Sequence, residues 1–257
     1  MNLVQGEILE LKAMKKYPAQ LFYDGNLELL KRKKISIVGT RKPSKYSRMQ
    51  IQKLASSLAK VGVCIVSGGA MGIDAVAHNG ASTCSTIAVL PCGVDIRYPA
   101  VNKNLLNEIQ KDGLLLSQFD TSFRATPWSF VVRNELVVAL GDVLVVGEAD
   151  LNSGTMRSVE FALKMGKEIY VLPQRIGESE ATNKLLSQNK AKAIYDIDEF
   201  ISQFADTLHV EKKTDDFLLF CESNPSYDEA LKKYPDKVFE AELNGDIIVK
   251  NGQIFIV

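Results

Sequence analysis

Short apolar runs alternate with longer stretches of helical periodicity along most of the chain. The clearest example is at 63–77, where the apolar run 63–66 leads into a glycine-rich turn and then into apolar residues spaced three or four apart. Short runs with β-branched residues are typical of buried strands, and a spacing of three or four is typical of a helix. The turn at 67–72 is therefore predicted to join a strand to a helix.

The same alternation predicts further strands and helices over the central part of the chain. Strands are expected at 35–38, 86–90, 114–116, 143–146 and 169–172, and helices at 45–60, 102–111, 130–140 and 153–165. Regular alternation of strands and helices favours parallel strands joined by right-handed crossovers. The pattern therefore predicts an α/β fold with a doubly wound, mostly parallel sheet.

The two ends of the chain depart from this alternation. Residues 1–34 are expected to form a short, partly helical lead-in, and residues 35–207 carry the alternating pattern. Residues 208–257 hold helical runs followed by two short apolar strands with an Asn-Gly pair between them, which is typical of a tight hairpin. We expect a small winged-helix-like C-terminal domain there.

The formal net charge is zero, but the charges are unevenly distributed. Residues 1–60 hold 13 basic and 4 acidic side chains, residues 61–210 hold 12 and 17, and residues 211–257 hold 6 and 10. The N-terminal part is thus the expected polyanion-facing surface. The basic run 31–34 within it is by itself more typical of a solvated turn. We expect the acidic C-terminal part to contact protein, because DNA-binding modules are normally basic.

The four cysteines indicate neither a metal site nor a disulfide framework, since they form no CxxC pair and have no histidine at ligand spacing. We therefore expect no metal and no cofactor. No apolar run approaches the roughly 18 residues that a membrane span needs. The first residues do not resemble a signal peptide. These features predict a cytoplasmic protein with no membrane span.

Two strand-to-helix turns carry the features of phosphate-binding loops. In the turn 67–72 the glycines allow close approach, and the following helix presents free N–H groups and the positive end of its dipole. A second turn, at 39–44, carries Arg41 and Lys42, and Ser44 is suited to cap the next helix. Because both turns follow parallel strands, we expect them side by side in one crevice at the carboxyl edge of the sheet.

Other polar residues have alternative interpretations. Asp74 and His78 lie four residues apart, and a structural pair at the helix start is favoured over an acid–base pair. A dinucleotide site using Asp95 is disfavoured, because its GxGxxG fingerprint would need glycine where Ser67 stands. The chain has one other histidine, His209, so no catalytic triad is indicated and no catalytic residue is predicted.

Six motifs follow one another at defined spacings within the alternating part. They are IVGTR (37–41), SGGAMGIDAVAH (67–78), IAVLPCGVDIRYP (87–99), FVVRN (130–134), SGT (153–155) and ATNKLL (181–186). In order and spacing they resemble the DprA (Smf) family of bacterial DNA-processing proteins. The resemblance covers about 17–204 and implies an extended Rossmann-like fold and a homodimer. It also implies binding of single-stranded DNA without sequence preference, and loading of the RecA recombinase in natural transformation.

The resemblance assigns the DNA-binding residues one by one. They are Gly39, Thr40, Arg41, Lys42, Ser67, Gly68, Gly69, Phe130, Arg133, Asn134, Arg175 and Asn183. It implies that Arg41 binds a phosphate with two hydrogen bonds, and that the N–H groups of 67–69 hold a neighbouring phosphate. Phe130 is suited to stack on a base of any sequence, although an aromatic residue at helical spacing is more often a core residue.

The chain departs from the family pattern at three places. Glu135 stands where the family commonly has an arginine, so a positive charge is replaced by a negative one. Gln174 replaces the glycine of a Pro-Gly turn, and Asn189-Lys190 replaces a Gly-Ala pair. Arg175 is expected to supply charge that the chain otherwise lacks.

A hydrolase is the alternative function. Nucleoside-monophosphate N-glycosidases of the LOG (lysine-decarboxylase-like) type carry a late PGGxGTxxE signature, in which the glutamate assists cleavage. The corresponding stretch here keeps Gly154 and Thr155, but lacks the leading Pro-Gly-Gly and has Glu160 two positions too far along. We therefore expect a non-enzymatic DNA-binding protein.

Overall fold

The computed structural model describes residues 2–204, 216–221, 223–244, 247–250 and 252–256. The described residues belong to two compact units, one within 1–205 and the other within 206–257. The boundary that the sequence predicts at 207/208 lies outside the described residues. Each unit is therefore considered by itself.

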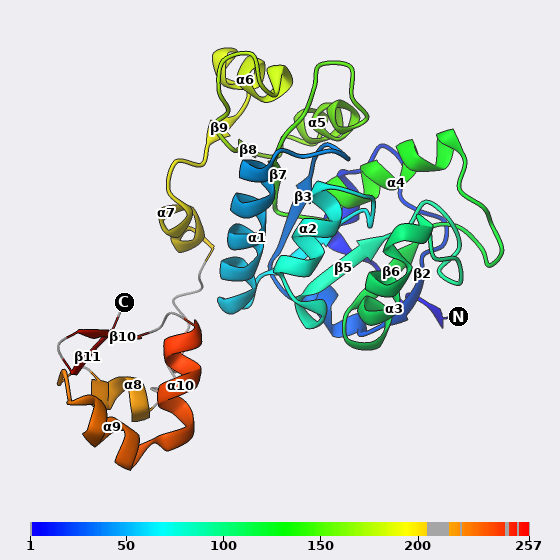
Figure 1. Cartoon of the computed structure of the whole chain (residues 1–257). Helices are drawn as coiled ribbons and strands as arrows, with labels where there is room; N and C mark the ends of the chain where they lie inside the picture. Colours follow the sequence, from blue (N-terminus) through cyan, green and yellow to red (C-terminus); the bar gives the residue numbers. More distant parts are fainter. Residues whose placement is uncertain (1, 205–215, 222, 245–246, 251, 257) are drawn as a thin grey trace. The chain divides into compact units, whose positions relative to one another are not determined.

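One sheet organises the first unit, in the order β1-β2-β6-β5-β4-β3-β7-β8-β9 (Figure 1). Its strands are β1 (Asn2–Leu3), β2 (Phe22–Gly25), β3 (Lys34–Val38), β4 (Cys64–Ser67), β5 (Thr86–Val89), β6 (Leu114–Ser117), β7 (Val143–Val146), β8 (Ile169–Val171) and β9 (Lys192–Ala193). The strands from β3 to β9 pair in parallel, whereas β1 and β2 are antiparallel to their neighbours. The predicted mostly parallel, Rossmann-like α/β fold is confirmed.

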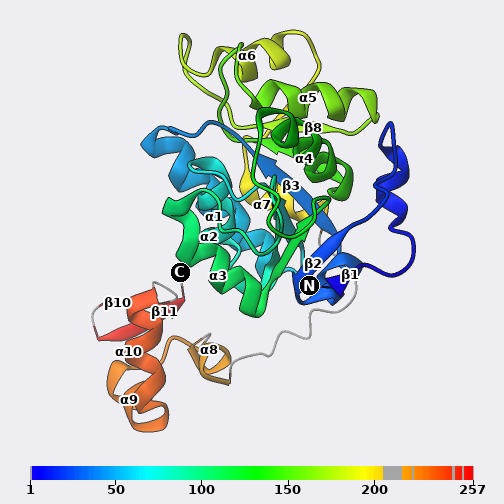
Figure 2. The same ribbon diagram turned by 90° about the vertical axis from the view of Figure 1, so that its right-hand side faces the viewer.

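Helices cover both faces of this sheet (Figures 1 and 2). One face is covered by α1 (Lys45–Lys60), α2 (Ile73–Gly80), α3 (Lys103–Asp112) and α7 (Ile197–Ser202), and the other by α4 (Pro127–Leu140), α5 (Thr155–Lys164) and α6 (Glu180–Ser187). Side chains of a strand alternate between the faces, so Ile65 packs in the α1–α2 core while Val66 packs in the α4–α5 core.

The strand order places an opening at one edge of the sheet. β3 pairs with β4 on one side and with β7 on the other. Strands β4 to β6 therefore extend the sheet on one side of β3, and β7 to β9 extend it on the other. The connections that leave β3 and β7 therefore diverge to opposite faces. In open α/β sheets ligands bind at such a switch point, beyond the carboxyl ends of the strands.

The N-terminal segment is more than the predicted helical lead-in. It carries the 3₁₀ helices η1 (Leu9–Ala13) and η2 (Leu27–Lys31), and its strand β2 pairs with β6, with Tyr23 opposite Leu116. The sequence pattern missed this strand because Phe22–Gly25 has two aromatic residues followed by Asp-Gly, a pair that is typical of turns. Pairing with β6, rather than local preference, makes this segment extended.

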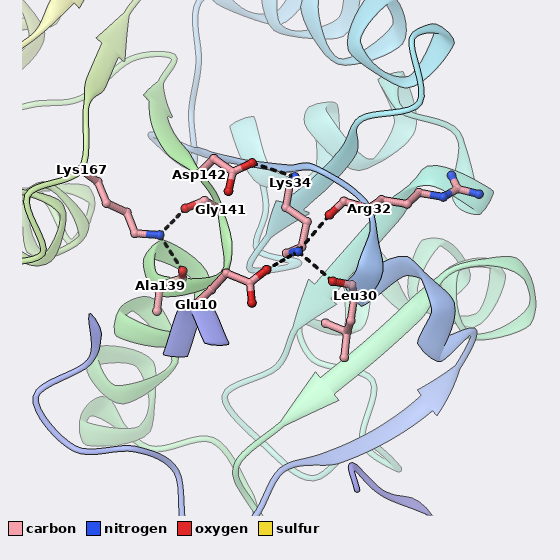
Figure 3. A network of polar contacts seen from close by, with 8 residues as sticks. All are labelled: Glu10, Leu30, Arg32, Lys34, Ala139, Gly141, Asp142 and Lys167. Carbon is pink, nitrogen blue, oxygen red and sulfur yellow. Dashed lines mark hydrogen bonds and ion pairs between the residues drawn. The ribbon is translucent and has the colours of Figure 1, made fainter. Parts of the chain in front are cut away.

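A buried lysine fastens the N-terminal segment to the sheet (Figure 3). The side chain of Lys34 is 3% exposed; its Nζ lies 2.6 Å from Glu10 Oε1 and donates to the carbonyl oxygens of Leu30 and Arg32 at 2.8 and 2.9 Å. Burial alone would raise the pKa of Glu10, but the hydrogen bond from Lys34, a backbone hydrogen bond and the positive charges of Lys34 and Lys167 together lower it. The last residue of the basic run 31–34 is therefore an internal cation, not part of a solvated turn.

The second unit has its own small core. It comprises α8 (Asp216–Cys221), α9 (Tyr227–Lys233), α10 (Pro235–Asn244) and the antiparallel strands β10 (Ile247–Lys250) and β11 (Gln253–Ile256). Phe217, Val238 and Ile254 are among its buried residues. The described helices and strands follow the predicted order, and their assignment as a winged helix stays a prediction.

Candidate nucleic-acid interface

A cavity of about 610 Å³ lies at the carboxyl ends of β3 and β7, where the strand order places the switch point. It is lined by Val38, Gly39, Thr40, Arg41, Lys42, Ala70, Asp74, Phe130, Arg133, Asn134, Glu148, Asp150, Ser153, Gly154, Thr155 and Ser158. Loops after three strands and the first two turns of α4 and α5 thus contribute to one cavity. Most residues that the resemblance assigns to DNA binding lie on its wall.

The turn after β3 is held tightly while its cations stay exposed. A Cβ atom at Gly39 would lie 2.5 Å from Cγ1 of Ile73, so no larger residue fits there. The N–H of Thr40 donates to the Glu148 carbonyl at 2.8 Å, and the Thr40 carbonyl accepts from the N–H of Ile73 at 3.1 Å. Arg41 and Lys42 follow, both exposed. The turn therefore presents two cations from a fixed backbone.

The second turn holds an anion that the protein itself supplies. The N–H groups of Gly68 and Ala70 donate to Oδ2 of Asp74 at 3.2 and 3.3 Å, and both Gly68 and Gly69 are buried. The hydroxyl of Ser67 donates to the Ile37 carbonyl at 2.6 Å. Asp74 thus already accepts from the Gly68 N–H, and phosphate binding by the N–H groups of this turn stays a prediction. The N–H of Ile73, the first residue of α2, is also paired, because it donates to the Thr40 carbonyl.

Arg133 lines the cavity, but it is almost wholly buried. It is 5% exposed, and its Nη1 donates to the carbonyl oxygens of Gly68 and, at 3.2 Å, of Val89. Burial lowers its pKa, and the nearby Asp74 carboxylate opposes that change. Burial likewise raises the pKa of Asp74, against the effects of Arg133 and of the two amides. Arg133 thus ties α4 to the ends of β4 and β5.

Phe130 lies close to two arginines. The Cζ atoms of Arg41 and Arg133 each lie 5.8 Å from the centre of its ring, and the ring is half-buried. Its position follows from the start of α4 at Pro127, where the Thr126 hydroxyl accepts from the Ser129 N–H at 3.2 Å. Phe130 is therefore fixed in the first turn of a capped helix, with part of its surface turned to the cavity.

The cavity also contains acidic residues that were not predicted from the sequence pattern. The Glu148 carboxylate accepts from the N–H and the hydroxyl of Ser44, both at 2.9 Å, and Asp150 lies further along the same loop. Their position just after the predicted strand 143–146 could have indicated that they lie at the carboxyl edge of the sheet. With Asp74, they offset much of the charge of the cavity's cations, so the cavity is of mixed charge rather than strongly basic.

The N-terminus of α5 completes the wall. Its N-cap, Gly154, has no side chain to accept from the first N–H groups, and Ser153 and Thr155 also line the cavity. The positive end of the helix dipole therefore adds to the potential of Arg41 at this edge.

Besides Ser67, Gly68 and Gly69 of the second turn, two predicted residues lie outside the cavity. Arg175 is exposed and lines a separate cavity with Ser44 and Tyr46. Asn183 donates from Nδ2 to the carbonyl oxygens of Arg175 and Glu178, at 3.1 and 3.0 Å. Asn183 therefore shapes the loop that carries Arg175.

The departures from the family pattern have structural partners. Oε1 of Glu135 accepts from the N–H of Lys15 at 3.0 Å, and Glu135 does not line the cavity. Gln174 donates from Nε2 to the Ser47 hydroxyl and the Gly147 carbonyl, at 3.0 and 3.1 Å. Glu135 thus joins α4 to the N-terminal segment instead of placing a negative charge among the cavity's cations.

Asp74 and His78 do not form the predicted pair. Nδ1 of His78 lies 2.7 Å from the Thr86 hydroxyl, which itself donates to the Ile65 carbonyl at 2.9 Å. Nδ1 must therefore carry the proton, and the buried Nε2 has no hydrogen-bond partner. Burial lowers the pKa of His78 to about 3, so the ring is neutral.

The geometry does not favour the hydrolase alternative. Glu160 pairs with Arg157 at 2.9 Å and lines a different cavity, between α5 and α6. Within the described ranges, no group of three or more His, Cys, Asp or Glu side chains could hold a metal ion. Nor does any helix of the described part combine the length and apolar character needed to cross a membrane.

Fold and cavity together define an α/β protein with a Rossmann-like sheet and a crevice at its switch point. The family model described as DNA recombination-mediator protein A matches residues 8–205, and the chain belongs to this family. Among curated proteins, it is 35% identical to DNA processing protein DprA of Streptococcus pneumoniae over 191 residues, which cover 73% of this chain and 67% of that protein. It is 32% identical to DprA of Bacillus subtilis, covering 75% and 66%. The chain spans about two thirds of the length of these relatives.

Solved structures give the same result. DNA processing protein A of Helicobacter pylori, whose structure was described for its unique single-stranded DNA binding mode, is 39% identical, with a TM-score of 0.78 over 81% of this chain and 97% of that one. The Streptococcus pneumoniae structure is 34% identical, with a TM-score of 0.71 over 76% and 70%.

Proposed function

We propose that this chain is a non-enzymatic mediator of recombination that binds single-stranded DNA in the cavity at the switch point. The observation that carries the proposal is the position of exposed Arg41 next to half-buried Phe130, a cation and an aromatic ring in one cavity. Single-strand binding needs both elements, a cation for the backbone and a ring for the bases. Membership of a recombination-mediator family supports the same function.

In the proposed complex the DNA backbone lies along the turn after β3. The Arg41 guanidinium binds a phosphate, Lys42 adds charge, and a base stacks on Phe130. Because Arg41 lies over the ring in the free protein, its side chain has to move aside for the base. Stacking tolerates every base, since each has a π face, so the proposed binding is independent of sequence.

The proposed biological role is to protect incoming single strands and to load RecA on them during natural transformation. We propose that the chain acts as a homodimer, and that the acidic C-terminal unit contacts protein. RecA filament formation on DNA coated with single-strand-binding protein, followed through RecA ATPase activity, tests the loading step. Stimulation by the protein supports it, and an unchanged rate contradicts it.

A mobility-shift comparison of single-stranded and duplex DNA of one sequence, at matched salt, tests the binding step. We expect preferential binding of the single strand, because paired bases cannot stack on Phe130. Equal affinity for both forms would contradict the proposed site, since it would indicate binding through the DNA backbone alone.

A further inference from the structure

We infer that the binding surface continues beyond Phe130, over Tyr98 to Arg124, and holds the neighbouring nucleotides of the same strand. This inference rests on the proposed function. Residues Tyr98, Asp95, Ile96, Ser122, Arg124 and Ala125 line this second stretch, which is called the Tyr98 groove below.

Shared walls connect the Tyr98 groove with the cavity at the switch point. Arg41 and Phe130 line both that cavity and a small cavity of about 30 Å³ next to it. Tyr98 also lines the small cavity, and it lines the Tyr98 groove, which has a volume of about 520 Å³. A strand that leaves Phe130 thus meets Tyr98 next, with no intervening element between the two rings.

The two rings are spaced for successive bases. The ring centres of Phe130 and Tyr98 lie 5.7 Å apart, and the ring planes are inclined by 63°. Tyr98 is 42% exposed, so part of its ring is available for stacking. Bases stacked on both rings would be inclined to each other, and the strand therefore turns as it passes from Phe130 to Tyr98.

The far end of the Tyr98 groove provides a cation. Arg124 is exposed there, on the loop between β6 and α4. Both carboxylate oxygens of Asp95 face the N–H of Ser122, at 3.2 and 3.0 Å, and so hold this loop against the 90–99 loop. Because Asp95 repels phosphate, the backbone is expected on the Arg124 side and the base on the Tyr98 side. Arg124 and Tyr98 would thus bind a phosphate and a base in the same way as Arg41 and Phe130.

Binding of fluorescein-labelled oligo(dT) of increasing length tests this extension by fluorescence anisotropy. Oligomers of about four nucleotides are expected to fill the switch-point cavity with their terminal base on Phe130, and oligomers of about twelve continue over Tyr98 to Arg124. We expect Tyr98→Ala and Arg124→Ala to bind the short oligomers like the wild type and the long ones about tenfold more weakly. Tyr98→Phe keeps the ring and should retain the affinity for long oligomers.

Matched controls are Tyr195→Ala, which removes an 86% exposed ring, and Arg32→Ala, which removes an exposed cation from the opposite edge of the sheet. Equal affinity of Tyr98→Ala and wild type at every length would overturn the extension. An equal loss at every length would overturn it too, because Tyr98 would then act only by supporting Phe130. Failure of the wild type to bind any oligomer would instead contradict the proposed function.

Discussion

The carboxylate of Asp74 accepts a hydrogen bond of 3.2 Å from the backbone N–H of Gly68 and so occupies the place predicted for a phosphate. A phosphate bound by the N–H groups of Gly68 and Ala70 would have to displace Asp74. We therefore propose that the exposed cations Arg41 and Lys42 bind the DNA backbone. The predictions below therefore give Arg41 the electrostatic role and Phe130 the stacking role.

Arg41→Ala is expected to weaken binding of oligo(dT) by roughly 10- to 150-fold, the equivalent of about 1.5–3 kcal/mol for hydrogen bonds to a charged group. Because Arg41 is exposed, the melting temperature should stay close to that of the wild type. The slope of log affinity against log salt should become shallower by about 0.7 for the lost phosphate contact. Anisotropy titrations at several salt concentrations measure both, with Arg32→Ala as the control. An unaltered slope would count against a phosphate contact.

Phe130→Ala is expected to lose about 1–3 kcal/mol of binding free energy, the contribution of one stacked base. Its salt slope should equal that of the wild type, because stacking releases no counterions. Phe130→Trp keeps a stacking surface and should bind better than Phe130→Ala. The same titrations give the result, and wild-type affinity in Phe130→Ala would make Phe130 a packing residue only.

His78 should make the stability of the first unit depend on pH. The pKa of His78 is about 3 in the folded chain against an ordinary value of 6.5, so between these values the unfolded chain binds more protons. The free energy of unfolding therefore falls as pH is lowered through this window, by up to about 1.4 kcal/mol per pH unit.

His78→Gln removes the titrating group and should flatten this pH dependence between pH 7 and 5. Urea unfolding followed by the fluorescence of Trp128, the chain's single tryptophan, measures it. His209→Gln is the control for loss of a histidine. A wild-type slope in His78→Gln would contradict the assignment.

Lys34→Met is expected to destabilise the first unit by about 3 kcal/mol, because it leaves the Glu10 carboxylate half-buried without its cation. The double variant Glu10→Gln, Lys34→Met should lose less than the sum of the single variants, since it leaves no unpaired charge. Urea midpoints of the four proteins complete the cycle. Additive losses would show that the ion pair in Figure 3 is not energetically coupled.

The sequence predicted the sheet more fully than the site. Strands such as Val143–Val146 are apolar throughout because they are buried on both faces, so local pattern reveals them. Strand β2 was missed because its extended form depends on pairing with β6, which is remote in sequence. The turn that begins at Gly39 was also predicted from local pattern, because an apolar strand run precedes it and a helical run follows it.

The partners of the polar side chains could not be predicted in this way. Gly68 is suited to bind an anion, but whether that anion is a phosphate or Asp74 depends on how the following helix is placed. Arg133 follows Phe130 closely in sequence, yet its guanidinium is buried against the ends of two strands. Such outcomes depend on three-dimensional packing that spacing does not encode.

Photocrosslinking of a 5-iodo-deoxyuridine oligonucleotide tests the central claim most directly, since it identifies the residue against which a base lies. After trypsin cleavage, the expected crosslinked peptide is Ala125–Arg133, with the modification on Phe130, and Arg41→Ala should reduce its yield. Crosslinks confined to peptides of the C-terminal unit, with Phe130 unmodified, would contradict binding in the cavity at the switch point.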